Sequence, residues 1–99
     1  MITAIILVNA TIGQVPTVAR ALAEVPGVVE TYSVAGDYDI VAIVRVKEHE
    51  EFAGLVTERI GRISGITKTV TLIAFQYFPS SLMERAWSIG MEEEAGEKK

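Results

Sequence analysis

Two kinds of apolar segment alternate along the first 77 positions of the chain. Near-continuous or alternating runs rich in isoleucine, valine and threonine, typical of strands, occupy residues 2–9, 28–35, 40–47 and 66–77. Apolar side chains spaced three or four positions apart, as on the buried side of a helix, occupy residues 14–25 and 48–62. The pattern therefore predicts two strand-helix-strand units in succession.

The two units repeat one pattern at an offset of 38 residues. The apolar positions of segment 2–8 return in segment 40–46, and Val-Pro-Gly-Val at 25–28 returns as Ile-Ser-Gly-Ile at 63–66. Two copies of so short a unit indicate one domain made of two similar halves. The order βαββαβ predicts an α+β, ferredoxin-like fold with a four-stranded antiparallel sheet. Right-handed crossovers place its first and third strands in the middle.

Both helices are expected on one face of this sheet, which leaves the other face open. The face assigned to the helices holds Ile2, Ala4, Ile6, Val8, Val28, Tyr32, Val34, Ala42, Val44, Ile66, Val70 and Leu72. The open face is assigned Thr3, Ile5, Leu7, Val29, Thr31, Ser33, Val41, Ile43, Thr69, Thr71, Ile73 and Phe75. Such a mixture of apolar and hydroxyl side chains suits packing on a second sheet. We therefore predict a homodimer joined through its open faces, a dimeric α+β barrel.

The composition fits a small single domain. The chain has 99 residues, 49% of them hydrophobic, and no cysteine, which leaves no disulfide, thiolate nucleophile or cysteine-bound metal. We place the domain at residues 1–78 and an extra C-terminal tail at 79–99, helical from Ser80 or Ser81 and then disordered. No basic leader precedes the first apolar run, and no run approaches the roughly 20 residues of a bilayer span. A cytoplasmic protein without a membrane partner is expected.

The charge pattern argues against nucleic acid as a direct partner. The net charge is −4 and the basic residues are scattered, whereas phosphate binding needs a basic stripe. The only histidine, His49, lies among glutamates without a second ligand or nucleophile. Asp37 and Asp39 could form an acid-base pair, but no nucleophile or oxyanion device accompanies them. We therefore predict no catalytic residue, no metal site and no cofactor, and hence a protein that is not an enzyme.

The segment Ala-Gly-Asp-Tyr-Asp-Ile at 35–40 joins the second and third strands and carries the candidate chemistry. Gly36 supplies a positive φ, and Asp37 and Asp39 can bond their own backbone, so a hairpin turn alone accounts for them. The loop also offers backbone N–H groups beside two carboxylates, which together can hold both ends of a zwitterion. Both interpretations stay open at this point.

The order and spacing of several short motifs resemble a known domain. Gly36-Asp37-Tyr38-Asp39 stands before a Val/Ile strand, after Pro-Gly-Val at 26–28 and before Gly-Ile-Thr-Lys-Thr-Val-Thr at 65–71. This combination, over roughly residues 1–77, resembles the RAM domain, the effector-binding domain of the Lrp/AsnC transcription regulators. The resemblance implies sheet-packed dimers that form rings, often octamers, with an amino acid effector bound between dimers. The implied ligand contacts are Gly36, Asp37, Tyr38, Asp39, Thr69 and Thr71.

Other features keep alternatives open. No helix-turn-helix is visible, so the chain resembles a stand-alone RAM domain that co-assembles with full-length Lrp/AsnC regulators or acts as a small sensor. A ferredoxin-like monooxygenase is an alternative, although its pocket needs polar groups where this chain has aliphatic ones. An ACT-like ligand-binding module is another, with Gly13 as its faint match. Strand preference also explains Thr69 and Thr71, and capping of the hairpin also explains Tyr38.

Overall fold

The computed structural model describes residues 1–81 and shows the predicted element order. The elements are β1 (Ile2–Ala10), α1 (Val15–Ala23), β2 (Val28–Ser33), β3 (Ile40–Val46), α2 (His49–Gly54), the π-helical turn η1 (Leu55–Arg59), the 3-10 turn η2 (Ile60–Arg62) and β4 (Ile66–Ala74). The consecutive elements α2, η1 and η2 together form the second helix of the fold. The expected helix in the tail lies almost wholly outside the described residues.

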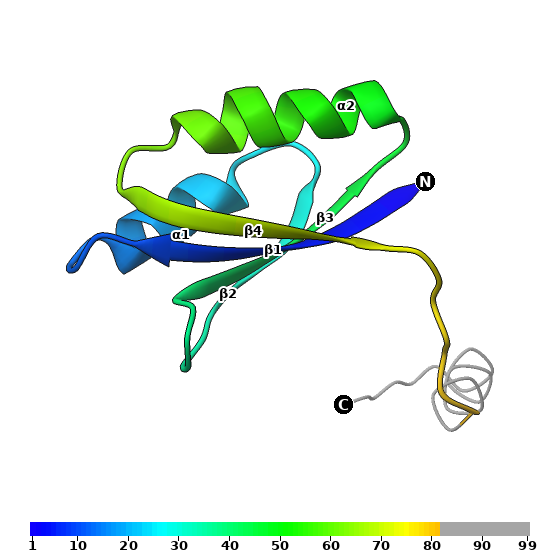
Figure 1. The fold of residues 1–99 in the computed structure, drawn as a ribbon, viewed down its shortest axis with the longest axis horizontal. Helices are drawn as coiled ribbons and strands as arrows, with labels where there is room; N and C mark the ends of the chain where they lie inside the picture. The colour runs from blue at the N-terminus through cyan, green and yellow to red at the C-terminus, as the bar shows by residue number, and fades with distance from the viewer. Residues whose placement is uncertain (82–99) are drawn as a thin grey trace, which may run out of the picture.

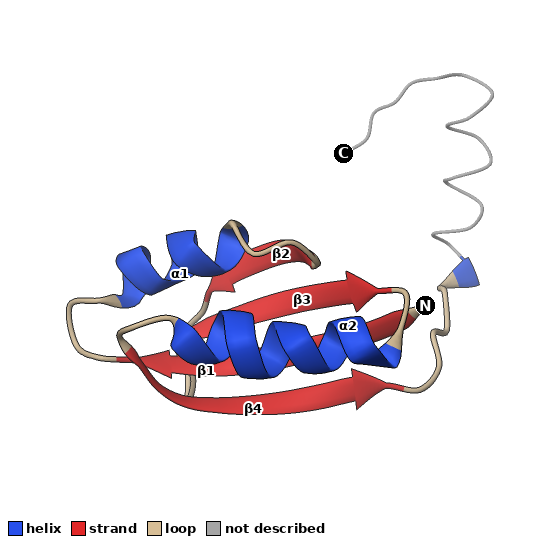
Figure 2. Cartoon of the chain, turned by 90° about the horizontal axis from the view of Figure 1, so that it is seen from above, coloured by secondary structure: helices blue, strands red, loops and turns tan. Residues whose placement is uncertain are grey.

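The four strands form one antiparallel sheet in the order β2-β3-β1-β4, which confirms the predicted central pair. Both helices cover the same face of the sheet (Figures 1 and 2). The core lies between the sheet and this helix layer. Its fully buried members are Ala4, Ile6, Val8, Val18, Leu22, Ile40, Ala42, Val44, Leu55 and Ile60. Within residues 1–81, no helix is long and apolar enough to cross a bilayer.

The predicted division of side chains between the two faces is right for the central strands and wrong for the outer ones. Each outer strand contains a β-bulge close to its start. In β2 the register shifts between Val28 and Glu30. In β4, Ile66 pairs with Ala10 whereas Lys68 pairs with Asn9, so one extra residue lies between them. An extra residue moves every later side chain to the opposite face, because side chains alternate along a strand.

The cross-strand partners show which residues the bulges exchange, since side chains directly opposite each other share a face. Tyr32, Val70 and Leu72 were assigned to the helices but lie on the open face, opposite Val41, Leu7 and Ile5. Thr31, Ser33, Thr69, Thr71 and Ile73 were assigned to the open face but lie on the helix side, opposite Ala42, Ile40, Val8, Ile6 and Ala4. The open face therefore gains Tyr32, Val70 and Leu72, and it also carries the charged residues Glu30 and Lys68, opposite Ile43 and Asn9.

Candidate ligand-binding site

The loop that joins β2 to β3 is a hairpin end that projects away from the helix layer (Figure 1). Gly36 lies near its tip with a φ of 127°, which confirms the predicted positive φ. A Cβ built on Gly36 would meet no atom within 4 Å, so the surrounding space is open. The hairpin closes where the Val34 N–H donates a hydrogen bond of 2.9 Å to the Asp39 carbonyl. The glycine is thus required by backbone conformation and not by crowding inside the chain.

Asp39 fastens this hairpin to the neighbouring central strand. Its backbone N–H donates to the Val8 carbonyl at 3.0 Å, and its Oδ2 accepts a hydrogen bond of 3.0 Å from the Ala10 N–H. The carboxylate therefore accepts a backbone donor of β1 just beyond Val8 and Ile40, the last pair between β1 and β3. One oxygen of Asp39 is committed to the fold, which leaves the other for any additional contact.

Asp37 and Tyr38 have different surroundings from Asp39. Asp37 is exposed, and its carboxylate makes no hydrogen bond to any other residue in the range 1–81. The Tyr38 ring is half-buried, and Lys68 Nζ lies 5.9 Å from its centroid, within the range of a cation–π contact. Lys68 comes from β4, on the far side of β1. Sequence reasoning missed Lys68 because nothing in the local pattern links it to the hairpin.

Thr69 and Thr71 do not join this group within one chain. Thr69 lies at the same end of the sheet as the loop, because its partner Val8 also pairs with Ile40, the residue after Asp39. However, both threonines lie on the helix side of the sheet, whereas the loop projects away from that side. β1 also separates β4 from β3, so the two strands are about 9–10 Å apart. One chain thus brings Lys68, but neither threonine, to the predicted loop.

The loop and Lys68 together present groups of both signs. Asp37 offers a free carboxylate, Lys68 an ammonium group, and the turn at Gly36 an exposed backbone without a Cβ. A carboxylate ligand can approach Lys68 and backbone N–H groups, and an ammonium group can approach Asp37, through charge-assisted hydrogen bonds. The arrangement is suited to binding a small zwitterion.

Comparison with known proteins points to one family. Residues 3–82 match the Lrp/AsnC ligand binding domain. The HTH-type transcriptional regulator FL11 of Pyrococcus horikoshii is 40% identical over 73 residues, which cover 74% of this chain and 48% of the regulator. The chain spans less than half the length of the curated relatives of this kind that it matches. The similarity to these regulators is therefore confined to one part of them.

Solved structures agree with this result. The crystal structure of a Thermus thermophilus protein superposes with a TM-score of 0.76 and 44% identity, covering 81% of this chain and all of that chain (100%). A feast or famine regulatory protein from M. tuberculosis, complexed with L-methionine, has a TM-score of 0.68 at 24% identity. This match covers 82% of the present chain and 54% of the other, and at that identity it concerns the fold alone.

Proposed function

Since this chain belongs to the Lrp/AsnC ligand-binding domain family, we propose that it is a regulatory domain that binds a free amino acid and assembles with copies of itself. The observation that carries this proposal is that the hairpin presents side chains of both charges that are not paired with each other. Asp37 is unpaired within residues 1–81, and Lys68 extends over the Tyr38 ring beside it. An amino acid needs an acceptor for its ammonium group and donors for its carboxylate in one small place, and this loop supplies both.

The proposed site consists of Gly36, Asp37, Tyr38, Asp39 and Lys68 of one chain, with Thr69 and Thr71 supplied by an adjoining subunit. Two chains are needed because the threonines lie on the helix side of their own sheet. Asp37 binds the ammonium group in this proposal, since one oxygen of Asp39 already accepts the Ala10 N–H. A related fold has been crystallised with L-methionine, which supports a free amino acid as the class of ligand.

The proposed assembly begins with a homodimer through the open sheet face. Tyr32 of β2 and Leu72 of β4 lie at the two edges of that face and are 51% and 48% exposed in the single chain, so the face presents large apolar side chains to solvent across its width. Dimers then form a ring, commonly an octamer in this family, with ligand sites between dimers. The domain acts by co-assembly with full-length Lrp/AsnC regulators and without contacting DNA itself.

Isothermal titration calorimetry with the twenty amino acids tests the site. We expect at least one to bind the wild-type protein and not Gly36→Val, because a β-branched residue is strained at a φ of 127° and brings methyl groups to the ligand. Gly13→Val is the matched control, because Gly13 has a φ of 85° and equally open surroundings in a different loop.

The two variants distinguish the proposal from its alternative. Binding that survives in folded Gly36→Val shows that the hairpin is not the site. Binding lost in Gly13→Val but kept in Gly36→Val supports an ACT-like module instead. Circular dichroism of each variant establishes that the fold is retained.

A further inference from the structure

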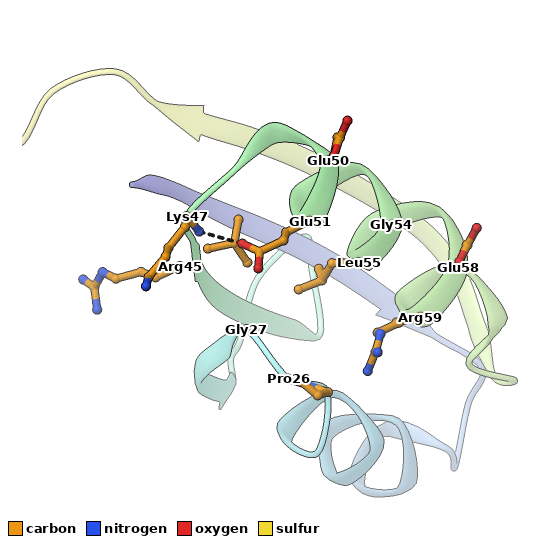
Figure 3. Close-up of a pocket in the computed structure, with 11 residues that line it drawn as sticks. Pro26, Gly27, Arg45, Lys47, Glu50, Glu51, Gly54, Leu55, Glu58 and Arg59 are labelled. Carbon is orange, nitrogen blue, oxygen red and sulfur yellow. Dashed lines mark hydrogen bonds between the residues drawn. The ribbon is translucent and has the colours of Figure 1, made fainter.

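A second hollow lies at the opposite end of β3 from the hairpin. It is a pocket of about 560 Å³ bounded by the second helix, the end of β3 and the loop from α1 to β2 (Figure 3). Its lining includes Pro26, Gly27, Val46, Leu55 and three cationic residues, Arg45, Lys47 and Arg59, of which Arg45 points away from the hollow (Figure 3). The volume is within the range of small-molecule sites. Because Ile40 and Val46 are the two ends of β3, this pocket and the Gly36 loop are separated by the length of that strand.

The π-helical turn η1 determines which side chain faces this pocket. Leu55 and Ile60 are both buried, yet in a regular α-helix residues five apart differ by about 140° around the axis. The Ile60 N–H donates both to the Leu55 carbonyl, five residues back, and to the Val56 carbonyl, four residues back. The wider turn at Leu55 lets both side chains face the sheet. In an α-helix, Arg59 would follow Leu55 on the buried side. The extra residue displaces it, and Arg59 extends over the pocket towards Pro26 (Figure 3).

The carboxylates around the pocket do not neutralise Arg59. Glu50 and Glu58 also line the pocket, but their carboxylates point away from it (Figure 3). Glu51 points in, but its Oε1 accepts the Lys47 and Glu48 N–H groups at 2.9 and 3.2 Å as part of the capping box of α2. Glu51 also precedes Arg59 by eight residues, which is about 12 Å along a helix. The guanidinium is therefore free to bind an anion at its own end of the pocket.

The part of the pocket between Arg59 and Glu51 is apolar and closely packed. Leu55 is buried there, and a Cβ on Gly27 would lie 2.7 Å from Leu55 Cδ1 and 3.0 Å from Val46 Cγ1. Only a glycine at position 27 lets the chain approach the helix so closely. The floor thus offers aliphatic contact to a ligand of several carbons, and Arg59 offers a planar pair of donors to a carboxylate.

We infer that this pocket binds a small aliphatic monocarboxylate, with its carboxylate on Arg59 and its carbon chain over Leu55 and Val46. An α-amino acid is a poorer ligand here, because its ammonium group would lie beside the Arg59 guanidinium and far from Glu51. The inferred site is thus separate from the amino acid site proposed at the hairpin and does not depend on it.

Amide chemical shifts of the ¹⁵N-labelled full chain, titrated with hexanoate, test this inference. We expect saturable shifts at Gly27, Gly54 and Leu55, and none at these positions with hexylammonium or L-norleucine. Arg59→Gln should abolish the hexanoate shifts. Arg62→Gln is the matched control, because Arg62 is an exposed arginine of the same second helix that does not line the pocket, and it should leave the shifts unchanged.

Three outcomes would overturn the inference: no pocket shifts with hexanoate, the same shifts in folded Arg59→Gln, or equally large pocket shifts with L-norleucine. The dispersion of each amide spectrum shows that the variant is folded. Shifts at residues 36–39 with L-norleucine report on the hairpin site alone, so a failure there is distinguishable from a failure at Arg59.

Discussion

Asp39 shows why the role of a single side chain was hard to predict from the sequence. The Gly-Asp-Tyr-Asp segment indicated a turn, a ligand site or both, and the turn is confirmed by the positive φ of Gly36. The main contact of Asp39 is with Ala10, 29 positions earlier in the chain. Lys68 reaches Tyr38 across an even greater distance in sequence. Such contacts depend on strand register, which local motifs do not encode.

Replacing Asp39 should therefore destabilise the fold, whereas replacing Asp37 should not. Asp39→Ala leaves the part-buried Ala10 N–H without an acceptor, which should cost about 1–3 kcal/mol of unfolding free energy. Asp39→Asn keeps an acceptor oxygen and should cost less. Asp37→Ala, at an exposed position, should change stability by no more than about 0.5 kcal/mol. Urea unfolding followed by circular dichroism measures all three, and equal losses for Asp37→Ala and Asp39→Ala would contradict the assignment.

The strands and helices were predictable because the chain repeats itself. The offset of 38 residues indicated two similar halves, and the observed order β2-β3-β1-β4 confirms this. The repeat also includes the two β-bulges, which the pattern of apolar residues did not reveal. The bulge after Val28 in β2 has its counterpart after Ile66 in β4, which is 38 positions later. A bulge is defined by pairing with another strand. Counting alternate positions along one strand therefore assigned side chains to the wrong face beyond Val28 and Ile66.

The inward position of Thr31, which the bulge in β2 produces, leads to a stability prediction. Its Oγ1 is buried and has no hydrogen-bond partner, and its strand neighbour is the core residue Ala42. Thr31→Val has nearly the same shape and removes the unsatisfied hydroxyl, so unfolding free energy should rise by about 1 kcal/mol. Thr17→Val, at an exposed position of α1, should change it by no more than about 0.5 kcal/mol. Thermal unfolding of both variants checks this, and a loss of stability in Thr31→Val would show that the hydroxyl is satisfied.

The charge of the whole chain bears on what it contacts. A net charge of −4 disfavours approach to DNA phosphates, and its relatives are transcription regulators more than twice as long as the part that matches. We expect no sequence-specific DNA binding by the isolated chain. An electrophoretic mobility shift assay over a range of salt concentrations checks this. A salt-sensitive shift with a preferred site would contradict the expectation, since phosphate contacts weaken as salt rises.

The open face of the sheet leaves large apolar side chains exposed in the single chain. After the correction for the bulges, its apolar members are Ile5, Leu7, Tyr32, Val41, Ile43, Val70 and Leu72, and Glu30 lies among them opposite Ile43. The central members are only partly buried in one chain, and Tyr32 and Leu72 are about half exposed at 51% and 48%. A second copy placed face to face would cover them all, which explains why so small a chain has so many hydrophobic residues.

We therefore expect a dimer at micromolar concentration, with an interface that buries at least about 1,200 Å². Leu72→Glu should convert it to a monomer, because a carboxylate would be buried in the apolar interface without a partner. Ile73→Glu is a closely matched control: Ile73 is the next residue of β4 and 51% exposed against 48% for Leu72, but it lies on the helix side, opposite Ala4. Sedimentation velocity should show the dimer for wild type and Ile73→Glu and the monomer for Leu72→Glu. A monomeric wild type, or a dimer that survives Leu72→Glu but not Ile73→Glu, would show that the open face is not the dimer interface.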